Sequence, residues 1–453
     1  MKSRYDVIVA GAGPSGIAAA IAAAREGARV LLVEGSGILG GMNTAALVCP
    51  LMGFHAGEKQ VVRGFAQEII DRLMARGASR GHLSDPLGVA STITPIEPTA
   101  LKQVYFEMVA GQPGLDLLLH SFLCEARTSP KGISEVVCVN KSGRNVFSAS
   151  TFIDATGDGD LMALAGAAYT EGRPADGLAQ PMTLLFKLSG VDLDRVRAEM
   201  SGAPEQFILR KRVDLTGYVA VSGFFDAVRC AREAGDFSVE RDRVLFFQGT
   251  RPDEVFVNMT RVTRCRGTNG WELSHAEQEA RAQVDEILAF LRKYVPGFAG
   301  AVLAETGDCI GVRESRRLKG EYTLTEQDIL AGRRFDDSVA MCAFPIDIHD
   351  PAGKDLRWVK TNEPTCYDVP YRVMLPQAGK PGNLLVTGRC VSATHEAVAS
   401  VRITPTAMAL GEAAGIAAAL SLGHAGRCAD VEVEMLQARI ASHGGVPGRR
   451  WLD

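Results

Sequence analysis

The first 35 residues of the chain alternate between two hydrophobic patterns. Asp6–Ala10 is a short apolar run with three β-branched residues, which predicts a buried strand. The Ala-rich run from Ile17 to Glu26 predicts a helix, and Arg29–Val33 predicts a second strand. Strand, helix and strand in this order indicate an α/β fold.

Similar patterns continue along the chain. Further strands are predicted at 115–120, 150–154 and 383–387, and further helices at 65–75, 98–110, 161–168 and 406–420. From residue 181 to about 372, apolar runs such as MTLLFKLSG and RVLFFQG predict strands again, followed by a long helix at 275–294. This middle region therefore predicts a mixed or antiparallel sheet with helices.

Three glycines stand between the first strand and the first helix. Gly11 permits a tight turn, Gly13 leaves room for backbone N–H groups to approach a pyrophosphate, and Gly16 lets the helix pack closely on the strand. The second strand ends at Glu34, 18 positions after Gly16, where a carboxylate can accept both hydroxyls of a ribose. The pattern predicts a dinucleotide site, which NAD and FAD both fit. Its contacts are expected from Gly11, Gly13, Pro14, Ser15, Gly16 and Glu34.

Three later segments resemble parts of FAD domains of the glutathione-reductase type, and this resemblance favours FAD over NAD. The pair Gly40-Gly41 follows the second strand and allows close approach of a ligand. One strand leads into an A-T-G turn at Ala155, and another ends at Gly388 before a helix that starts near Pro405. The N-terminus of that helix is expected to face the flavin edge where negative charge develops. The expected FAD contacts here are Gly40, Gly41, Asn43, Thr44, Leu123, Ala155, Thr156, Gly157, Asp160, Gly388, Arg389, Arg402 and Ile403.

Composition limits the possible partners. The chain has 453 residues and a net charge of −4, which indicates a globular protein of two or three domains and gives no reason to expect nucleic acid. No apolar run reaches the roughly 20 residues that span a bilayer, so a cytoplasmic protein without a membrane span is expected. The ten cysteines contain no C-x-x-C pair, so buried reduced thiols and no metal site are expected. Asp158 and Asp160 are expected to form a turn and cap a helix rather than bind a metal.

Several long motifs resemble one known family. They are GAGPSGIAAA, LGGMNTAAL, DATGDGDLMALAG, GVRESRRLKGEYTLT, FPIDIHDP, YDVPYR and NLLVTGRCVSATHEAVASVRITPTAMALGEAAG, and they run from residue 5 to about 425. In this order they resemble the FAD-dependent oxidoreductase family of bacterial flavoproteins, distantly related to fumarate reductase and succinate dehydrogenase flavoprotein subunits. The long lid domain with which fumarate reductases bind dicarboxylates has no counterpart here, so that specificity is not transferred.

The resemblance implies a domain plan. It implies a Rossmann-like FAD-binding domain of the glutathione-reductase type, built from discontinuous segments, with an inserted α+β substrate domain. The expected boundaries are 1–50, 95–178 and 375–425 for the FAD domain, 51–94 for a flavin-covering insertion, 179–374 for the substrate domain, and 426–453 for a C-terminal helix and tail. The histidine to which some relatives attach FAD has no secure counterpart, so non-covalent FAD is expected.

The candidate catalytic residues are polar side chains in segments expected to face the flavin. An arginine there can stabilise anionic charge, and a histidine or tyrosine can exchange a proton with the substrate. The alternative is that the same residues form structural hydrogen bonds and ion pairs. The candidates are Arg313, His349, Tyr371, His395 and Arg402, with Arg316 a further arginine of the same segment as Arg313.

These residues and the FAD motifs together predict an oxidoreductase. We expect hydride transfer between flavin N5 and a small organic substrate, as a dehydrogenase of a C–OH or C–NH group or as a reductase of an activated C=C. An external electron acceptor or donor would complete the cycle. A flavin monooxygenase is one alternative, although the Asp-Gly motif of hydroxylases is replaced here by Gly388-Arg389. A flavin-binding protein without turnover is the other alternative, and the oligomeric state stays open.

Overall fold

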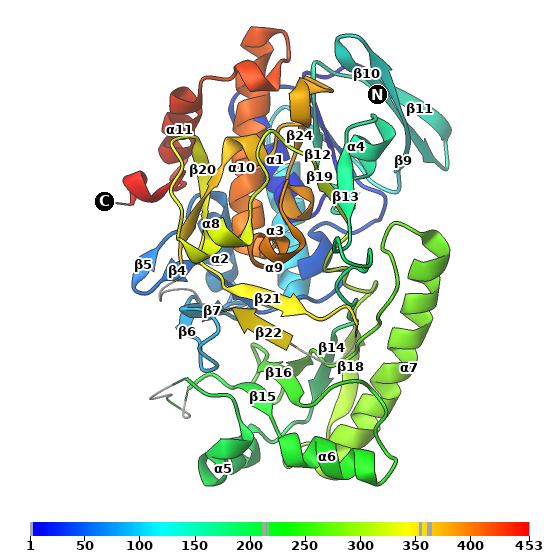
Figure 1. Ribbon diagram of the computed structural model, residues 1–453, viewed down its shortest axis with the longest axis vertical. Helices are drawn as coiled ribbons and strands as arrows, with labels where there is room; N and C mark the ends of the chain where they lie inside the picture. The colour runs from blue at the N-terminus through cyan, green and yellow to red at the C-terminus, as the bar shows by residue number, and fades with distance from the viewer. Residues whose placement is uncertain (1–2, 211–213, 215–216, 353–355, 360–364, 453) are drawn as a thin grey trace.

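Five parallel strands form the central sheet of one half of the molecule (Figure 1). A computed structural model describes residues 3–210, 214, 217–352, 356–359 and 365–452. The strand order is β24 (Leu384–Val386), β12 (Thr151–Asp154), β1 (Val7–Ala10), β2 (Val30–Val33) and β8 (Leu115–Leu118). Val7 pairs with Thr151 on one side and with Val30 on the other, and every residue of β1 is buried. The expected α/β fold and the five predicted strands are therefore confirmed.

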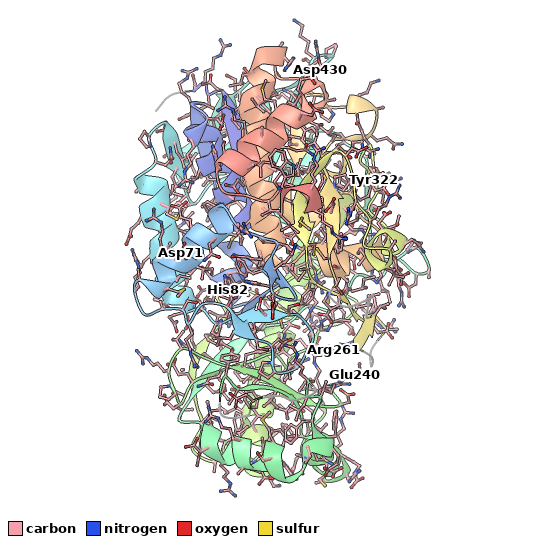
Figure 2. The ribbon with its side chains drawn as sticks, turned by 90° about the vertical axis from the view of Figure 1, so that its left-hand side faces the viewer. Asp71, His82, Glu240, Arg261, Tyr322 and Asp430 are labelled. Carbon is pink, nitrogen blue, oxygen red and sulfur yellow. The ribbon has the colours of Figure 1, made fainter. Side chains whose placement is uncertain are left out.

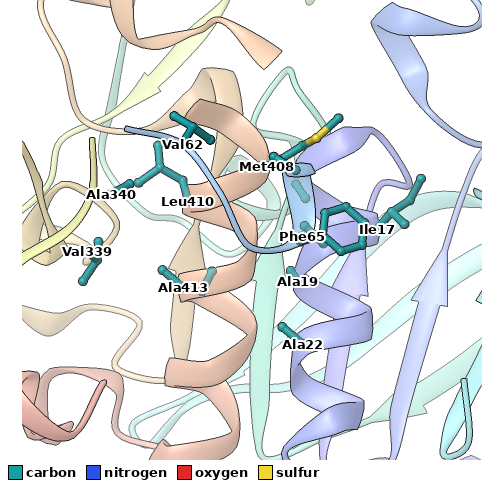
Figure 3. Close-up of a cluster of buried hydrophobic side chains, with 14 of the residues drawn as sticks. Ile17, Ala19, Ala22, Val62, Phe65, Val339, Ala340, Met408, Leu410 and Ala413 are labelled. Atoms are coloured by element: carbon teal, nitrogen blue, oxygen red, sulfur yellow. The ribbon is translucent and has the colours of Figure 1, made fainter. Parts of the chain in front are cut away.

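Two helices far apart in sequence cross tightly on this sheet. α1 (Pro14–Arg25) follows β1, and α10 (Thr404–Ser421) follows β24 and the short helix α9 (His395–Val401). A Cβ built on Gly411 would lie 2.1 Å from the backbone oxygen of Ser15, and one built on Gly415 would lie 2.1 Å from that of Ala19. Figure 3 shows Ala19 and Ala22 of α1 beside Ala413 of α10. Glycine at these two positions is what lets the backbones meet.

The helix α10 also explains an apolar stretch in the sequence. Thr404–His424 is long and apolar enough to cross a membrane by length and composition, the one such helix found in the described part of the chain. However, 72% of its apolar window is buried inside the protein. Its apolar character therefore fits a core helix, packed against α1 and next to β20 (Ser338–Cys342).

A three-stranded antiparallel sheet covers one edge of the half that contains the parallel sheet. It consists of β9 (Phe122–Ser129), β10 (Gly132–Asn140) and β11 (Gly143–Ser148). The helix α4 (Asp160–Leu164) is shorter than the predicted 161–168. The predicted capping by Asp158 and Asp160 is wrong, because the two carboxylates pair with Arg389 and Arg316. The buried Asp154 satisfies backbone N–H groups at the start of this helix instead, since it accepts hydrogen bonds from the N–H groups of Thr156 and Met162.

The other half of the molecule has its own core. Its antiparallel sheet has the order β15 (Ala220–Gly223), β16 (Val244–Gln248), β17 (Val255–Val257), β14 (Phe186–Ser189) and β18 (Val302–Thr306). The helices α5 (Leu193–Gly202), α6 (Phe225–Glu233) and α7 (Gly270–Tyr294) lie beside it (Figure 1). This arrangement confirms the prediction of an antiparallel sheet with a long helix.

The second core is smaller than the sequence suggested. Its buried residues extend from Met182 to Val312, whereas the expected substrate domain ends at residue 374. The segment that follows packs back on the first core. It contributes β19 (Arg316–Leu318), α8 (Glu326–Leu330), β20, β21 (Ile346–His349), β22 (Leu356–Val359) and β23 (Tyr367–Pro370). β20 and β23 pair with each other, and β19 pairs with β13 (Tyr169–Glu171).

The two halves are joined by the insertion after β2 and by polar contacts. The insertion contains β3 (Leu51–Met52), β4 (His55–Ala56), β5 (Lys59–Gln60), α2 (Phe65–Met74), β6 (Leu83–Ser84) and β7 (Thr92–Thr94), and α3 (Pro98–Ala110) follows it. Leu87 and Ile93 of this insertion pack against Ala220 and Phe247 of the second half. Arg261 lies where the halves meet and donates a hydrogen bond to the backbone oxygen of Asp350, 2.7 Å away (Figure 2).

Candidate functional site

The glycines after β1 form an open cradle at the N-terminus of α1. Gly11 has a φ of +92°, and a Cβ there would lie 2.5 Å from the backbone oxygen of Ala155. A Cβ on Gly16 would lie 1.9 Å from the backbone oxygen of Gly11. A Cβ on Gly13, in contrast, would meet nothing within 4 Å, and no side chain caps the helix there. Space beside an uncapped helix N-terminus is what a pyrophosphate needs.

The carboxylate of Glu34 is held beside this cradle. It accepts hydrogen bonds from the N–H of Ala12 at 2.8 Å and from the N–H of Ser36 at 2.8 Å. These two bonds tie the end of β2 to the loop after β1. The position is the one at which the sequence expects a ribose to bind.

Two other predicted segments, those of Gly41 and Gly388, close around the same cradle. A Cβ on Gly41 (φ +47°) would lie 3.1 Å from the Cα of Gly13, and one on Gly388 (φ +75°) would lie 3.2 Å from the Cβ of Ser15. The hydroxyl groups of Ser15 and Thr387 are 2.9 Å apart. Residues that are hundreds of positions apart in the sequence therefore meet at the N-terminus of α1.

The remaining predicted FAD contacts have less uniform surroundings. The Asn43 side chain is fully buried, and its Oδ1 has no hydrogen-bond partner in the described structure, while Thr44 donates to the backbone oxygen of Leu39. The Thr156 hydroxyl donates to Asp154 and accepts from the N–H of Asp160. Leu123 is half-buried in β9, next to Phe122, which the sequence analysis missed. Phe122 is 69% exposed, and its ring approaches Gly35 just after β2.

A cavity of about 240 Å³ lies between the two cores. The predicted residues Arg313, His349, Arg389, Arg402 and Ile403 line it. Further lining residues come from the segment after Gly41, from the insertion, from the half of the molecule with strands β14–β18, and from β21 and α10. They include Met42, Val48, Cys49, Pro50, Leu87, Val89, Thr183, Leu185, Leu245, Phe247, Asn258, Asp347 and Thr404. The cavity thus joins segments predicted for the flavin to the face of the second domain.

His349 and Asp347 form a pair on the strand β21. Their side chains lie on the same face because they are two positions apart in a strand. Nε2 of His349 lies 3.3 Å from Oδ2 of Asp347, and its Nδ1 is buried with no hydrogen-bond partner in the described structure. Burial, and after it the charge of Arg313, lowers the pKa of His349 to about 3. These causes favour the neutral imidazole, whose Nδ1 makes no hydrogen bond in the described structure.

Two arginines of the cavity are bound by neutral groups. The guanidinium of Arg313 donates to the backbone oxygen of Pro181 and to the hydroxyl of Thr183. That of Arg402 donates to the backbone oxygens of Arg313, at 3.0 Å, and Asp347, at 3.3 Å. Among the described residues, no carboxylate lies within ion-pair distance of either guanidinium. Burial lowers the pKa of both side chains.

Two predicted catalytic residues are placed elsewhere. The Tyr371 hydroxyl donates to the backbone oxygen of Cys428, and the side chain is buried in the first core. Nδ1 of His395 is 2.8 Å from Oε2 of Glu314, which also pairs with Arg317. Neither residue is among those that line the cavity. The structure therefore supports structural roles for both.

The cysteines and acidic residues of the described structure were compared with the donor sets that metal ions require. In the part of the chain that the structure describes, no group of three or more His, Cys, Asp or Glu side chains is arranged to hold a metal ion. All ten cysteines are free thiols, and six of them are buried. Cys124 and Cys230 are exposed, which differs from the expectation that all would be buried.

Comparison with known families decides between NAD and FAD as the cofactor. Residues 6–440 match the family described as FAD dependent oxidoreductase. The chain belongs to this family. It is therefore an FAD-dependent enzyme, and the choice between NAD and FAD that the first motif left open falls on FAD. The open cradle at Gly13, the bound position of Glu34 and the unpartnered Oδ1 of Asn43 fit that cofactor.

Solved structures resemble this family member only distantly. A geranylgeranyl bacteriochlorophyll reductase-like protein from Thermoplasma acidophilum is 13% identical, with a TM-score of 0.47, and the match covers 97% of this chain and 83% of that chain. The p-nitrophenol 4-monooxygenase PnpA from Pseudomonas putida DLL-E4 is 10% identical, with a TM-score of 0.45 and coverage of 98% and 81%. PqsL, a probable FAD-dependent monooxygenase from Pseudomonas aeruginosa, is 13% identical, with a TM-score of 0.43 and coverage of 97% and 93%. A search of curated proteins finds no match.

Proposed function

We propose that this enzyme transfers a hydride between flavin N5 and a small organic substrate bound in the cavity between the two cores. The observation that carries the proposal is that one cavity contains both the segments predicted for the flavin and the His349–Asp347 pair. When bound, FAD supplies the acceptor or donor of the hydride. Non-covalent binding of FAD and the glutathione-reductase subtype of the fold are part of the same proposal.

Different residues of the chain hold the two halves of the cofactor. Gly11–Gly16, Glu34, Gly41 and Gly388 surround the N-terminus of α1 and would hold the ADP half. Met42, Val48–Pro50 and Arg402–Thr404 line the cavity and would surround the isoalloxazine ring. No side chain caps the N-terminus of α10, and Arg402 stands just before it. Both features favour negative charge at this end of the cavity.

His349 is the group best placed to move a proton. Asp347 faces Nε2 and thereby orients the ring, which leaves Nδ1 as the proton acceptor. In an oxidation, Nδ1 takes the proton of a C–OH or C–NH group while the hydride leaves the adjacent carbon. In the reverse direction, the protonated ring returns that proton to the substrate. Asp347 is a positioning residue in this scheme, because it acts through His349.

Anaerobic titration of the FAD-loaded protein tests the proposal. A panel of alcohols and amines is added to the oxidised protein, and activated alkenes are added to the dithionite-reduced protein. Bleaching of the flavin band near 450 nm by a donor, or its return with an alkene, is the expected result. In the responding reaction, His349→Gln should lower the rate of flavin reduction or reoxidation by about 100-fold or more while the FAD content stays unchanged.

Two results would contradict this proposal. If no member of the panel changes the flavin spectrum in either direction, the protein binds flavin without this turnover. If substrate is consumed only with oxygen and a nicotinamide reductant, and the product carries a new hydroxyl group, the enzyme is a monooxygenase. The exposed Glu434→Gln variant serves as the matched control, because its side chain lies on α11 (Val433–Ser442), outside the cavity lining.

A further inference from the structure

The cavity lining divides into an apolar part and a cationic part. The apolar side chains come from the insertion and from the second domain, namely Leu87, Val89, Leu185, Leu245 and Phe247. The cationic part contains Arg313 and Arg402, with Asp347 the one carboxylate among the described lining residues. This division places constraints on any ligand, because each part has to be matched by ligand groups of suitable chemistry.

In the described structure, the arginines of the cationic part and one behind it have no ion-pair partner, although Arg313 and Arg402 are only partly buried. Behind the lining, Arg241 is only 7% exposed and donates to the backbone oxygens of Met259, at 3.1 Å, and Thr260, at 3.3 Å. As with Arg313 and Arg402, no carboxylate in the described structure is within ion-pair distance of its guanidinium. Burial and the charge of Arg261 lower the pKa of Arg241 to about 9. The charge of Arg241 in turn helps to lower the pKa of Arg313.

Buried or partly buried guanidinium groups without a carboxylate at ion-pair distance are costly for a folded protein. Each one loses hydration, and backbone oxygens replace only part of it. Neighbouring positive charges add repulsion, which Asp347 offsets only in part. A bound anion would remove this cost and would form charge-assisted hydrogen bonds with the planar guanidinium of Arg313.

The apolar part has the opposite preference. Leu87 and Phe247 are 5% and 8% exposed, and they pack in one cluster with Val89 and Leu245 as partly buried neighbours. Their side chains offer no hydrogen-bonding group to a ligand. Hydrocarbon placed against them gains about 25 cal/mol per Å² of apolar surface removed from water. A small hydrophilic acid would leave these apolar side chains in contact with water.

We propose that the substrate is an organic acid with an apolar body, whose carboxylate pairs with Arg313 and whose hydrocarbon part lies against Leu245 and Phe247. This inference rests on the proposed function only in naming the ligand as the substrate. It also links binding to chemistry. An anion beside Arg313 offsets the charge that disfavours protonation of His349, so the bound acid makes Nδ1 a better proton acceptor.

Three probes that share parts of this chemistry test the inference. Hexanoate has the charge and the tail, hexanamide has the tail without the charge, and acetate has the charge without the tail. Their binding to the FAD-loaded protein is measured by calorimetry. We expect hexanoate to bind at least about tenfold more tightly than either of the others, because each lacks one of the two matched parts. Equal affinity for hexanoate and hexanamide would overturn the inference.

Substitutions assign the two parts to residues. Arg313→Gln should weaken hexanoate binding by about tenfold or more and leave hexanamide unchanged, whereas Arg313→Lys should retain part of the preference for the anion. Phe247→Ala should weaken hexanoate and hexanamide alike. The matched control is Arg251→Gln, because Arg251 is on the second domain and exposed. A full retention of hexanoate binding in folded, FAD-loaded Arg313→Gln would overturn the inference.

The failures of this inference and of the proposed function are distinguishable. If hexanoate binds as expected but no donor or alkene changes the flavin spectrum, the binding inference holds and hydride transfer is wrong. If donors do reduce the flavin while the amide binds as well as the acid, hydride transfer holds and the substrate is not an anion. The flavin absorbance of each variant before titration shows that neither result comes from lost cofactor.

Discussion

His395 Nδ1 lies 2.8 Å from the carboxylate of Glu314, and this pair is almost completely buried. Glu314 also pairs with Arg317, so that one carboxylate holds two groups together. The arrangement favours a structural role for His395, and it leads us to expect that the stability of this region depends on Glu314.

Removing the Glu314 charge should therefore destabilise the protein strongly. Glu314→Gln leaves Arg317 buried without a counter-ion, which typically costs about 3–5 kcal/mol. His395→Asn should cost less, because the Glu314–Arg317 pair remains. Denaturant unfolding monitored by circular dichroism measures both. If Glu314→Gln unfolds at the same denaturant concentration as the wild type, the pair contributes nothing and the assignment is wrong.

Alanine substitutions at Gly13 and Gly11 should affect different properties, FAD binding in the first case and stability in the second. Gly13→Ala adds a Cβ into open space, so the protein should fold normally and lose FAD affinity by about tenfold or more as the pyrophosphate space fills. Gly11→Ala places a Cβ against Ala155 and strains a positive φ, so it should lower the melting temperature instead. FAD affinity is measured by flavin fluorescence quenching. Unchanged FAD affinity in folded Gly13→Ala would argue against the cradle.

Glu412 of α10 should make the protein less stable at high pH. Burial raises the pKa of its carboxyl from 4.5 to about 8, so the folded state keeps a proton that the unfolded state loses as the pH rises. This contribution to stability is complete below pH 4.5 and is lost as the pH approaches 8. Glu412→Gln should therefore be more stable than the wild type at pH 8, by up to about 4 kcal/mol, and close to it at pH 5. Equal unfolding midpoints at pH 8 would contradict the prediction.

His349 should have the opposite effect and make the protein less stable at low pH. Its pKa is lowered from 6.5 to about 3, so below pH 6.5 the unfolded state binds a proton that the folded state refuses. Stability should fall by about 2 kcal/mol between pH 7 and pH 5 from this residue alone. His349→Asn should remove that part of the pH dependence. The unfolding midpoints of both proteins at pH 7 and pH 5 decide the matter, and parallel losses in the two would refute it.

Local patterns were sufficient to predict much of the fold. The apolar run Val7–Ala10 and the glycines after it identify the central strand and the cradle, because both depend on residues close in sequence. The pair of Asp347 and His349 could also have been found, since the two are two positions apart in an alternating run that forms the strand β21. The candidate catalytic residues included His349 without Asp347, because the prediction used the chemistry of the histidine alone.

Other features depend on contacts that no local pattern contains. The segment with β20 and β23 resembles the strands β14–β18 in composition, yet it packs on α10. The second core therefore ends near Val312. Tyr371 stands in a motif of the family, but its hydroxyl meets Cys428 in the first core. The cationic part of the cavity likewise combines Arg313 and Arg402, which are brought together by the fold alone.

The contact between Ser15 and Thr387 joins residues that are 372 positions apart, which has a consequence during protein synthesis. The glycine loop and α1 are synthesised well before Gly388 and α10. Until α10 has been made, the Ala-rich face of α1 lacks the helix that covers it in the folded protein. The complete cradle, with Gly388 beside Ser15, therefore forms only after the chain has been synthesised through Gly388.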